Sequence, residues 1–486
     1  MTELPGTLWE VFSAHAQRIP QQLAICGTHT WTYQELLQRS AELAEAIGSR
    51  LGPGGLVALD AAGPTAGVVA LLAAGRAGCA VLPLNQDSPA HHREMVLADS
   101  RPGLLLQEEA DGALTVVELE HAGGAEPVGG DFHGVAYVLF TSGSTGRPKG
   151  VVVSQEALLA RLQGLARVPG LAPGESMLAM TAMSFDISMA EMLLPLAVGG
   201  SVLAAPVEAR LDPEVFERIV ADHNPEVIQA TPSFWRLALA WGWSGAADSR
   251  IWCGGEPMTR TLADGLVPVC KELWNVYGPT EATIWATAAR VGPEGDISLG
   301  SPLPGTGVFI EPGDTAQDGS GELIIYGAGL AQGYLNQEEL TRQKFVRLQT
   351  PEGLARCYRT GDRARYRADG TLEFLGRTDS QIKLRGYRIE LGEIESVLEE
   401  HPQVREAVVL LRYADDPSRA QLAAFLAAPD DLTIRRLRTW MAGRLPTGLR
   451  PQWFSITSAL PRTTAGKADR VRLAAMSHEV SDETLG

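Results

Sequence analysis

A short polar loop between two apolar runs constrains the fold of this chain more than any other feature. Residues 141–150 read TSGSTGRPKG, follow the apolar run 134–140 and precede the β-branched run 151–153. This pattern predicts two strands joined by a ligand-binding loop. Three glycines permit close backbone approach, four hydroxyls offer hydrogen-bond donors and Lys149 adds a cation, which together suit the oxygens of a polyphosphate.

The spacing separates this loop from a Walker A sequence. Walker A needs a glycine, four further residues and then Gly-Lys-Ser/Thr, whereas Gly143, Gly146 and Lys149 follow at intervals of three. A polar surface hairpin is the alternative, although the full string is far more specific than a lone glycine pattern. The residues expected to bind phosphate are Thr141, Ser142, Gly143, Ser144, Thr145, Gly146 and Lys149.

The string closely resembles the phosphate loop of adenylate-forming enzymes, which include acyl-CoA ligases, luciferases and the adenylation domains of nonribosomal peptide synthetases. The resemblance extends from about Thr7 to Arg470. It implies an α/β adenylate-forming fold with a large N-terminal core of doubly wound sheets and a small β-rich subdomain, followed by a small mobile α+β C-terminal domain. The expected limits are 1–378 for the core, 379–474 for the C-terminal domain and 475–486 for a tail.

Composition sets further bounds on function. The formal net charge of -17 predicts a surface that repels nucleic acid and anionic membranes, although plain solubility also accounts for it. The five cysteines form no CxxC pair, which favours reduced thiols. The N-terminus lacks a signal-peptide pattern, and no apolar stretch approaches the ~20 residues that span a bilayer. We therefore expect a cytoplasmic protein without a nucleic-acid or membrane partner.

Local patterns support an α/β architecture. Thr7 and Glu10 form a capping-box pattern that predicts a helix start. Residues 68–77 predict a helix that leads into a strand over 79–84, a βαβ rhythm typical of a parallel sheet. Glycines and prolines between residues 291 and 321 predict shorter strands and turns, as expected of a β-rich subdomain.

The string NVYGPTE supplies candidate nucleotide contacts. The resemblance implies that Tyr277 stacks on adenine, Asn275 reads the adenine edge, Thr280 contacts the α-phosphate and Glu281 binds magnesium. A single carboxylate is compatible with Mg²⁺, which takes most of its ligands from phosphate oxygens and water. A plain Gly-Pro turn is the alternative, and it leaves Glu281 unexplained.

Further family motifs occupy the second half of the chain. By resemblance, Asp362 binds the ribose hydroxyls, Arg377 and Gly255 contact the nucleotide, and Asp379 is the pivot of an interdomain hinge. A charged hairpin leading into a helix is the alternative to the hinge. Lys467 resembles the lysine that bridges the substrate carboxylate and the α-phosphate, which makes it the expected electrophilic catalyst together with Thr280 and Glu281. Three positions depart from the family pattern: Gln332 replaces the usual arginine, Ala465 replaces the usual asparagine, and the stretch 445–451 lacks the usual tyrosine.

Asp186 is the candidate anchor of the substrate. It lies within the apolar run 177–198, where a buried carboxylate is costly unless it is paired, and an ammonium ion would be a suitable partner. In the peptide-synthetase subfamily the matching aspartate holds the α-amine of the substrate, while a helix N-cap is the alternative. The family's specificity positions fall on Asp186, Ile187, Ala190, Gln229, Trp252, Gly254, Val276, Ile284, Trp285 and Lys467.

Two tryptophans and three branched residues leave little room for a side chain. The set resembles glycine-activating pockets, chiefly at Asp186, Ile187, Gln229, Gly254, Ile284 and Trp285. Ala190 departs from that pattern, since larger groups usually occupy this position, and Trp252 is the candidate to fill the volume it leaves. The alternative is that these are merely core residues. The resemblance therefore implies ATP- and Mg²⁺-dependent activation of a small amino acid, best glycine, with release of pyrophosphate. The expected second step is transfer to the phosphopantetheine thiol of a carrier protein in trans, and a small activator protein is a candidate further partner.

Two other functions are alternatives to this one. An acyl-CoA or aryl-acid ligase is the alternative enzyme, for which Asp186 would be an unhelpful anion near the substrate. A nucleotide-binding scaffold is the non-enzymatic alternative. It is disfavoured because Lys149, Glu281, Asp362 and Lys467 are all present.

Overall fold

The computed structural model describes residues 6–109, 112–120, 132–143, 148–312, 318–379, 381–414, 416, 419–429, 431–463 and 468–479. The chain divides into two compact units. The first unit comprises Met1–Gln86, Leu97–Phe140 and Gly150–Thr378. The second unit comprises Asp87–Val96, Thr141–Lys149 and Asp379–Gly486.

A seven-stranded sheet has the order β18-β8-β7-β4-β3-β5-β6. Its strands are β3 (Leu56–Asp60), β4 (Ala80–Pro83), β5 (Leu104–Glu108), β6 (Leu114–Glu118), β7 (Val135–Thr141), β8 (Lys149–Ser154) and β18 (Gly333–Tyr334). Helix α3 (Pro64–Ala77) joins β3 to its parallel neighbour β4, which confirms the predicted βαβ unit. The helix ends at Gly78, whose φ of 72° is the left-handed conformation that favours glycine after a helix.

A nine-stranded sheet has the order β15-β14-β13-β12-β11-β9-β10-β1-β2. Its strands are β1 (Leu23–Gly27), β2 (Trp31–Thr32), β9 (Ser176–Ala179), β10 (Ser201–Ala204), β11 (Val227–Ala230), β12 (Ala246–Gly254), β13 (Cys270–Tyr277), β14 (Thr287–Val291) and β15 (Ser301–Pro302). The six central strands pair in parallel in the order β13-β12-β11-β9-β10-β1. At the two edges, β2, β14 and β15 pair antiparallel. Two largely parallel sheets with helical connections confirm the expected α/β class.

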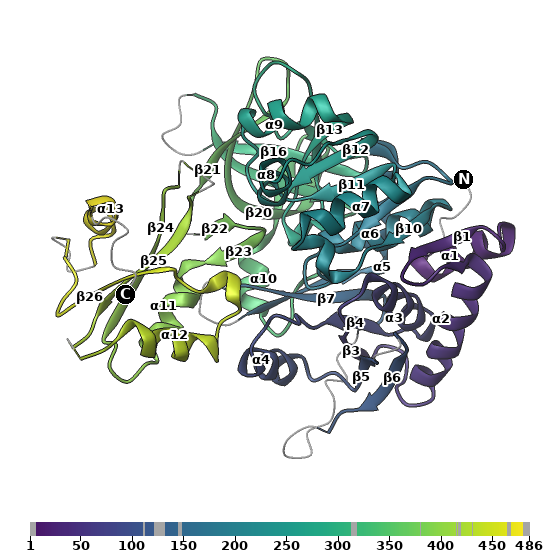
Figure 1. Ribbon diagram of the computed structural model, residues 1–486, viewed down its shortest axis with the longest axis horizontal. Helices are drawn as coiled ribbons and strands as arrows, with labels where there is room; N and C mark the ends of the chain where they lie inside the picture. The colour runs from purple at the N-terminus through teal and green to yellow at the C-terminus, as the bar shows by residue number, and fades with distance from the viewer. Residues whose placement is uncertain are drawn as a thin grey trace. The chain divides into compact units, whose positions relative to one another are not determined.

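The helices of the N-terminal part cover these sheets (Figure 1). Their bounds are α1 (Leu8–Arg18), α2 (Tyr33–Gly48), α5 (Gln155–Leu165), α6 (Ile187–Val198), α7 (Pro213–His223), α8 (Pro232–Ala240) and α9 (Arg260–Leu266). Two further helices are α4 (Ala90–Ser100), which begins in the second unit and ends in the first, and α10 (Glu338–Lys344), which lies beside β18 and β19. α1 begins with the predicted capping box, because the Thr7 hydroxyl accepts from the Glu10 amide and the Glu10 carboxylate accepts from the Thr7 amide. Helices α7, α8 and α9 pack on one face of β11–β13.

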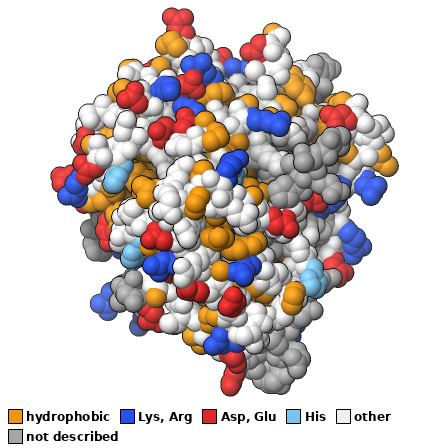
Figure 2. Space-filling model, turned by 90° about the vertical axis from the view of Figure 1, so that its right-hand side faces the viewer, with side chains coloured by type: hydrophobic (Ala, Val, Ile, Leu, Met, Phe, Trp, Pro, Cys, Tyr) orange, Lys and Arg blue, Asp and Glu red, His pale blue; other side chains and the backbone are white. Residues whose placement is uncertain are grey.

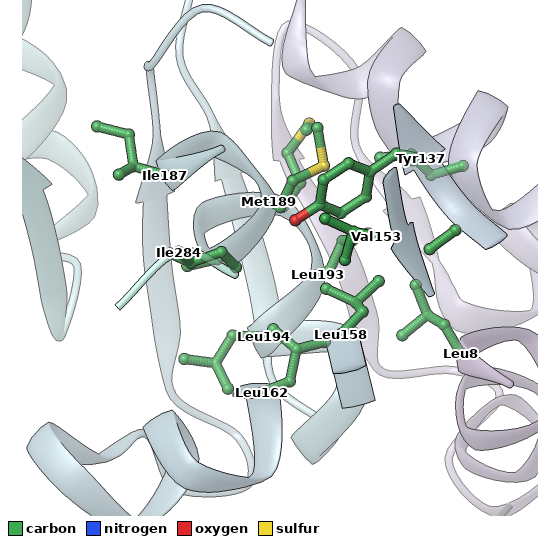
Figure 3. Packing of buried hydrophobic residues seen from close by; sticks show 14 of the residues in the cluster. Leu8, Tyr137, Val153, Leu158, Leu162, Ile187, Met189, Leu193, Leu194 and Ile284 are labelled. Carbon is green, nitrogen blue, oxygen red and sulfur yellow. The ribbon is translucent and has the colours of Figure 1, made fainter. Parts of the chain in front are cut away.

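The largest buried cluster joins α5 and α6 to β7 and β8 (Figure 3). Tyr137 of β7 reaches toward Met189 of α6, and Leu158 and Leu162 of α5 lie in the same cluster. Ten consecutive residues of α6, from Ile187 to Leu196, are buried. A helix enclosed on all sides needs apolar residues around its whole circumference, which explains why the sequence of α6 shows no clear helical stripe.

A five-stranded antiparallel sheet forms the β-rich part of the first unit. Its strands are β16 (Thr306–Pro312), β17 (Gly321–Gly327), β19 (Phe345–Thr350), β20 (Gly353–Tyr366) and β21 (Leu372–Arg377). The glycines and prolines between residues 291 and 321 therefore precede this sheet and extend to the start of its second strand, β17. Most of the sheet lies further along the chain. Its position agrees with the expected β-rich subdomain.

From Asp379 onward, the described residues of the second unit form a hairpin, a three-stranded sheet and three α-helices. These are β22 (Gln381–Leu384), β23 (Tyr387–Glu390), β24 (Glu406–Arg412), β25 (Gln421–Ala427), β26 (Trp453–Thr457), α11 (Leu391–Glu399), α12 (Ile434–Ala442) and α13 (Arg470–Glu479). Arg385 and Gly386 both have positive φ between β22 and β23, as the favoured two-residue hairpin turns require. The segment is thus a hairpin that leads into a helix, which is compatible with a hinge and with an ordinary hairpin.

The face drawn in Figure 2 carries acidic and basic side chains interspersed with scattered apolar groups. On this face the basic side chains form no continuous stripe. Across the described ranges, no helix combines the length and the hydropathy that a membrane crossing would require.

Candidate active site

The carboxyl ends of three neighbouring parallel strands bring candidate residues together. Gln229 is near the end of β11, Gly254 ends β12 and Tyr277 ends β13. Ligands of open α/β sheets bind outside the carboxyl ends of the strands. This edge of the nine-stranded sheet is therefore the place where the fold favours a site.

Five predicted specificity residues lie close together on neighbouring strands and in the segment between β13 and β14, and we call this buried group the pocket wall: Gln229, Trp252, Gly254, Val276 and Trp285. Gln229 pairs with Trp252 across β11 and β12, and Gly254 pairs with Val276 across β12 and β13. A Cβ atom on Gly254 would lie 2.7 Å from Val276 Cγ2 and 2.8 Å from Trp285 Cη2. Glycine at this position therefore allows the Trp285 ring to pack directly against the strand.

Asp186 precedes α6 but does not cap it. Its backbone is helical and its carboxylate makes no capping hydrogen bond, so the helix N-cap alternative is wrong. Instead, Asp186 Oδ2 accepts a 3.3 Å hydrogen bond from the backbone amide of Ile284. This contact joins two predicted substrate residues that are far apart in the sequence.

The backbone that presents this amide is strained. Thr283 and Ile284 have φ of 58° and 69°, in the left-handed region that β-branched residues rarely occupy. Such conformations cost on the order of 1–3 kcal/mol each, and they persist where surrounding contacts hold them. No sequence pattern indicated this strain. It directs the Ile284 amide toward Asp186.

A second carboxylate, Glu191, lies in the apolar run that contains Asp186, and the sequence interpretation missed it. Glu191 is fully buried in α6 and accepts from the Gln229 side-chain amide at 3.0 Å. Gln229 also donates to the Ile187 carbonyl and accepts from Trp285 Nε1 at 2.7 Å. Three of the specificity residues, Ile187, Gln229 and Trp285, are thus joined by buried hydrogen bonds. These contacts are compatible with core residues and with residues of a substrate pocket.

Tyr137 is a further polar group near the candidate substrate anchor. Burial raises the pKa of its hydroxyl well above the ordinary value, and the negative charge of Asp186 adds to that shift. Within the described part of the chain, this buried hydroxyl has no hydrogen-bond partner. An unpaired hydroxyl beside a carboxylate is suited to a polar group on a ligand.

The predicted ribose-binding residue lies within a network of nucleotide candidates. Asp362 Oδ2 accepts from the Tyr277 hydroxyl at 2.5 Å, and Asp362 Oδ1 accepts from Arg377 Nη1 at 2.5 Å. Burial raises the pKa of Tyr277 well above its ordinary value, and the charge of Asp362 adds to this. Tyr277, Asp362 and Arg377 are therefore joined in one hydrogen-bonded network.

The other predicted nucleotide residues of this edge have separate contacts. Asn275 donates from Nδ2 to the Ser298 carbonyl at 2.7 Å, so its side-chain orientation is fixed by the chain itself. Gly255 has φ of 87°, which glycine adopts without strain, and it follows directly after β12.

Thr280 and Glu281 lie in a short 3₁₀ turn after β13 (Thr280–Ala282). Glu281 is fully buried, and its Oε1 accepts a 2.7 Å hydrogen bond from the Tyr334 hydroxyl. The described residues contain no group of three His, Cys, Asp or Glu side chains arranged for a metal ion. The donor set fits Mg²⁺ held by one carboxylate and by nucleotide phosphates, and does not fit an all-protein metal cage.

Within the second unit, the described part of the phosphate loop contacts the β22–β23 hairpin. The Ser142 hydroxyl donates to the Arg388 carbonyl, and Lys149 Nζ lies 4.0 Å from Glu390 Oε1. Thr141 has a buried hydroxyl without a hydrogen-bond partner among the described atoms. Burial raises the pKa of the neighbouring Glu393 to about 8, while the backbone amide of Gly143 opposes the shift.

The predicted hinge residue Asp379 and the specificity residue Ala190 both lie in described segments. The Asp379 carboxylate accepts from the Gln381 amide at 3.2 Å, between β21 and β22. Ala190 is fully buried in α6, beside Glu191. Ser144, Thr145, Gly146 and Lys467 lie outside the described residues.

Comparison with known families identifies the class of protein that this fold and site define. Residues 12–335 match the AMP-binding enzyme family, and residues 393–467 match the AMP-binding enzyme C-terminal domain. The chain belongs to the AMP-binding enzyme family. Its sequence is similar to nonribosomal peptide synthetases, which agrees with the expected resemblance.

Three similar proteins support this placement. The dimodular nonribosomal peptide synthase of Bacillus subtilis (strain 168) is 34% identical over 98% of this chain, which spans only 21% of that relative's length. A four-domain nonribosomal peptide synthetase, holo-AB3403 bound to AMP and glycine, is 33% identical over 96% of this chain and 36% of its own, with a TM-score of 0.69. Holo-PA1221, which contains adenylation and PCP domains, is 28% identical over 96% of this chain and 84% of its own, with a TM-score of 0.82.

Proposed function

We propose that this adenylation domain activates a small amino acid, glycine before others, and then loads it onto a carrier protein that acts in trans. The first step consumes ATP and releases pyrophosphate. The second step transfers the aminoacyl group from the adenylate to the phosphopantetheine thiol of the carrier.

The observation that carries the substrate proposal is the contact between Asp186 and the Ile284 amide, beside the pocket wall. Asp186 supplies a counter-charge for an α-ammonium group. Trp252 and Trp285 are each at most 1% exposed and occupy volume that a large side chain would need. The similar synthetase holo-AB3403 was solved with AMP and glycine, which supports a glycine-sized pocket.

The nucleotide proposal rests on the contacts around Asp362. Its two carboxylate oxygens face a phenol and a guanidinium, and ribose hydroxyls would compete for the same acceptor positions. The Tyr277 ring would pack on adenine, and Asn275 and Gly255 would line the adenine edge. Mg²⁺ bound by Glu281 and by the phosphates would neutralise phosphate charge.

In the proposed reaction, a carboxylate oxygen of the amino acid attacks the α-phosphorus of ATP. The new oxygen–phosphorus bond forms as the bond from the α-phosphorus to the departing pyrophosphate breaks. Two anions approach one another in this step, so groups that neutralise charge in the transition state accelerate it. We assign this role to Lys467 and to the Thr280 hydroxyl. The loop residues Thr141 to Gly146 and Lys149 would hold the departing phosphates.

For the carrier-loading step, the domain 379–474 would rotate relative to the domain 1–378, with Asp379 as the pivot. Holo-PA1221 joins an adenylation domain to a PCP domain in one chain, which supports a carrier protein as the partner. A small activator protein remains a candidate second partner.

Pyrophosphate exchange tests the proposed substrate. Glycine, alanine, serine, leucine and phenylalanine are compared at equal concentration, with benzoate as an acid that lacks the α-amine. Glycine should be activated best, and bulky residues should lose roughly ten-fold or more, because forcing atoms into a packed wall costs ~1–3 kcal/mol. A strong preference for leucine or phenylalanine would refute the small-substrate proposal, and a preference for benzoate would refute amino-acid activation.

A further inference from the structure

We propose that Glu191 is a positioning residue of the substrate pocket, which orients Trp285 through Gln229 and thereby holds the pocket wall in place. This inference rests on the proposed function, because it assigns a role in substrate size selection. It concerns a residue that the substrate itself is not expected to touch.

Glu191 accepts four hydrogen bonds in the interior. Its Oε2 accepts from the backbone amides of Met180 at 2.9 Å and Thr181 at 2.8 Å. Its Oε1 accepts from the Thr181 hydroxyl at 2.6 Å and from Gln229 Nε2 at 3.0 Å. The carboxylate therefore links α6, the segment after β9, and β11.

The direction of these bonds determines the orientation of Gln229. An ionised carboxylate only accepts hydrogen bonds, so Gln229 must present its NH₂ group to Glu191, where it also donates to the Ile187 carbonyl. The Gln229 carbonyl oxygen then faces Trp285 and accepts from the indole Nε1 at 2.7 Å. In the opposite orientation, two donors would face one another at Trp285. We call the chain Trp285–Gln229–Glu191 the buried relay.

The environment of Glu191 explains why the carboxylate matters. The four donors are amides and a hydroxyl, and burial raises the pKa of Glu191 to about 7. A buried carboxylate held only by neutral donors costs stability relative to a neutral group of the same shape. Its useful contribution is an acceptor at both oxygens, which a glutamine side chain cannot supply.

The test substitutes Glu191→Gln in the full chain and measures pyrophosphate exchange with the amino acid that the wild type activates best. The new NH₂ group would oppose the Gln229 amide, and Gln229 could relax only by turning its own NH₂ group toward the Trp285 indole. We expect KM for the amino acid to rise about ten-fold, as for one buried hydrogen bond left unpaired, with KM for ATP unchanged.

A matched control lies at the other end of β9. Glu226 accepts from the Ser176 amide and hydroxyl, much as Glu191 accepts from those of Thr181, but among the described residues its side chain makes no hydrogen bond to the pocket wall. Glu226→Gln should leave both KM values unchanged. A rise in the amino-acid KM of this control equal to that of E191Q would contradict the proposal.

A double-mutant cycle with Trp285→Phe separates positioning from a general structural role. Phenylalanine lacks the indole donor, so a rotated Gln229 meets no opposing N–H. The effect of E191Q on KM should therefore shrink at least three-fold in the W285F background. Additive effects would overturn the proposal.

The indole resonance of Trp285 gives a readout that does not depend on activity. It is assigned by its absence in W285F, in ¹H–¹⁵N spectra of the ¹⁵N-tryptophan-labelled protein. E191Q should shift it upfield, because its hydrogen bond weakens, while E226Q should not. An unchanged resonance in E191Q would overturn the proposal. If the wild type activates no amino acid but E191Q still shifts the indole resonance of Trp285, the proposed function is refuted and the buried relay remains supported.

The double variant Glu191→Gln with Gln229→Glu tests rescue and covers the case in which E191Q alone does not fold. It exchanges donor and acceptor between the two positions, so Trp285 again faces an oxygen. Recovery of at least part of the wild-type amino-acid KM and of the indole shift supports the proposal. A folded double variant that recovers neither contradicts it.

Discussion

At the residue scale, two carboxylates that each precede a helix have different hydrogen-bond partners. Asp186 and Asp212 both precede helices, yet only Asp212 caps its helix, because its carboxylate accepts from the Glu214 amide of α7. A residue pattern alone could not separate these two cases. The difference arises from Ile284, nearly one hundred residues away from Asp186.

Asp186→Asn and Asp212→Asn should therefore act differently. The first removes the counter-charge for an α-ammonium, so we expect KM for the amino acid to rise at least ten-fold with little loss of stability, because the amide oxygen still accepts from Ile284. Asp212→Asn should leave exchange kinetics unchanged. The measurement is pyrophosphate exchange combined with urea unfolding, and equal KM values for D186N and the wild type would refute the anchor role.

The pH dependence of stability gives a second prediction at this scale. Burial raises the pKa of Glu191 from 4.5 to about 7, so the folded state binds this proton more tightly than the unfolded state. The stabilising contribution is fully present below about pH 4.5 and is lost as the pH rises through about 7. The free energy of unfolding should fall across this window. E191Q should show a shallower fall, whereas an identical pH profile would contradict the assigned direction.

Residues such as Glu191 also show where sequence reasoning stops. Its partners Gln229 and Thr181 lie on other segments, and Tyr334, which holds Glu281, is 53 residues away from it. Tyr277, Asp362 and Arg377 were predicted because each lies in a recognisable motif. Their mutual contacts, like the strain at Thr283 and Ile284, depend on packing that no local pattern encodes.

At the element scale, the features predicted best are those with local causes. The capping box of α1 and the unit of β3, α3 and β4 follow from residues close in sequence, and both were found as expected. The order of the nine-stranded sheet, in which β1 lies between β10 and β2, could not be read from periodicity. Strand order depends on which faces can be buried together.

The connection between β21 and β22 supports a prediction about motion. Asp379→Pro would fix φ at the proposed pivot, so adenylation should persist while thioester formation with a carrier protein slows by about ten-fold or more. Asp379→Ala is the control, because it removes the contact with the Gln381 amide but keeps φ free. Exchange and carrier loading are measured separately, and equal losses in both steps for D379P would argue against a pivot here.

At the scale of the whole molecule, the resemblance to a family predicts the class of enzyme, which local patterns alone do not. The family matches cover 12–335 and 393–467, which together include every candidate residue except Asp362, Arg377 and Asp379. Length and charge alone allowed many enzyme classes. The identity of the class came from several motifs in the correct order along the chain, each weak alone.

Substitution of the proposed ribose contact Asp362 and of the proposed catalyst Lys467 should have separable effects. Tyr277, Asp362 and Arg377 belong to the first unit, whereas Lys467 belongs to the second. Lys467→Ala should therefore retain ATP binding but lose exchange activity at least about 100-fold, because the lysine acts on charge that develops in the transition state. Asp362→Ala should instead weaken ATP binding itself, since it removes the acceptor for the ribose hydroxyls. Calorimetric titration with ATP, beside pyrophosphate exchange, distinguishes the two variants. Loss of ATP binding in K467A would show that the lysine already binds ATP before the reaction. Undiminished exchange in K467A would remove Lys467 from the proposed mechanism.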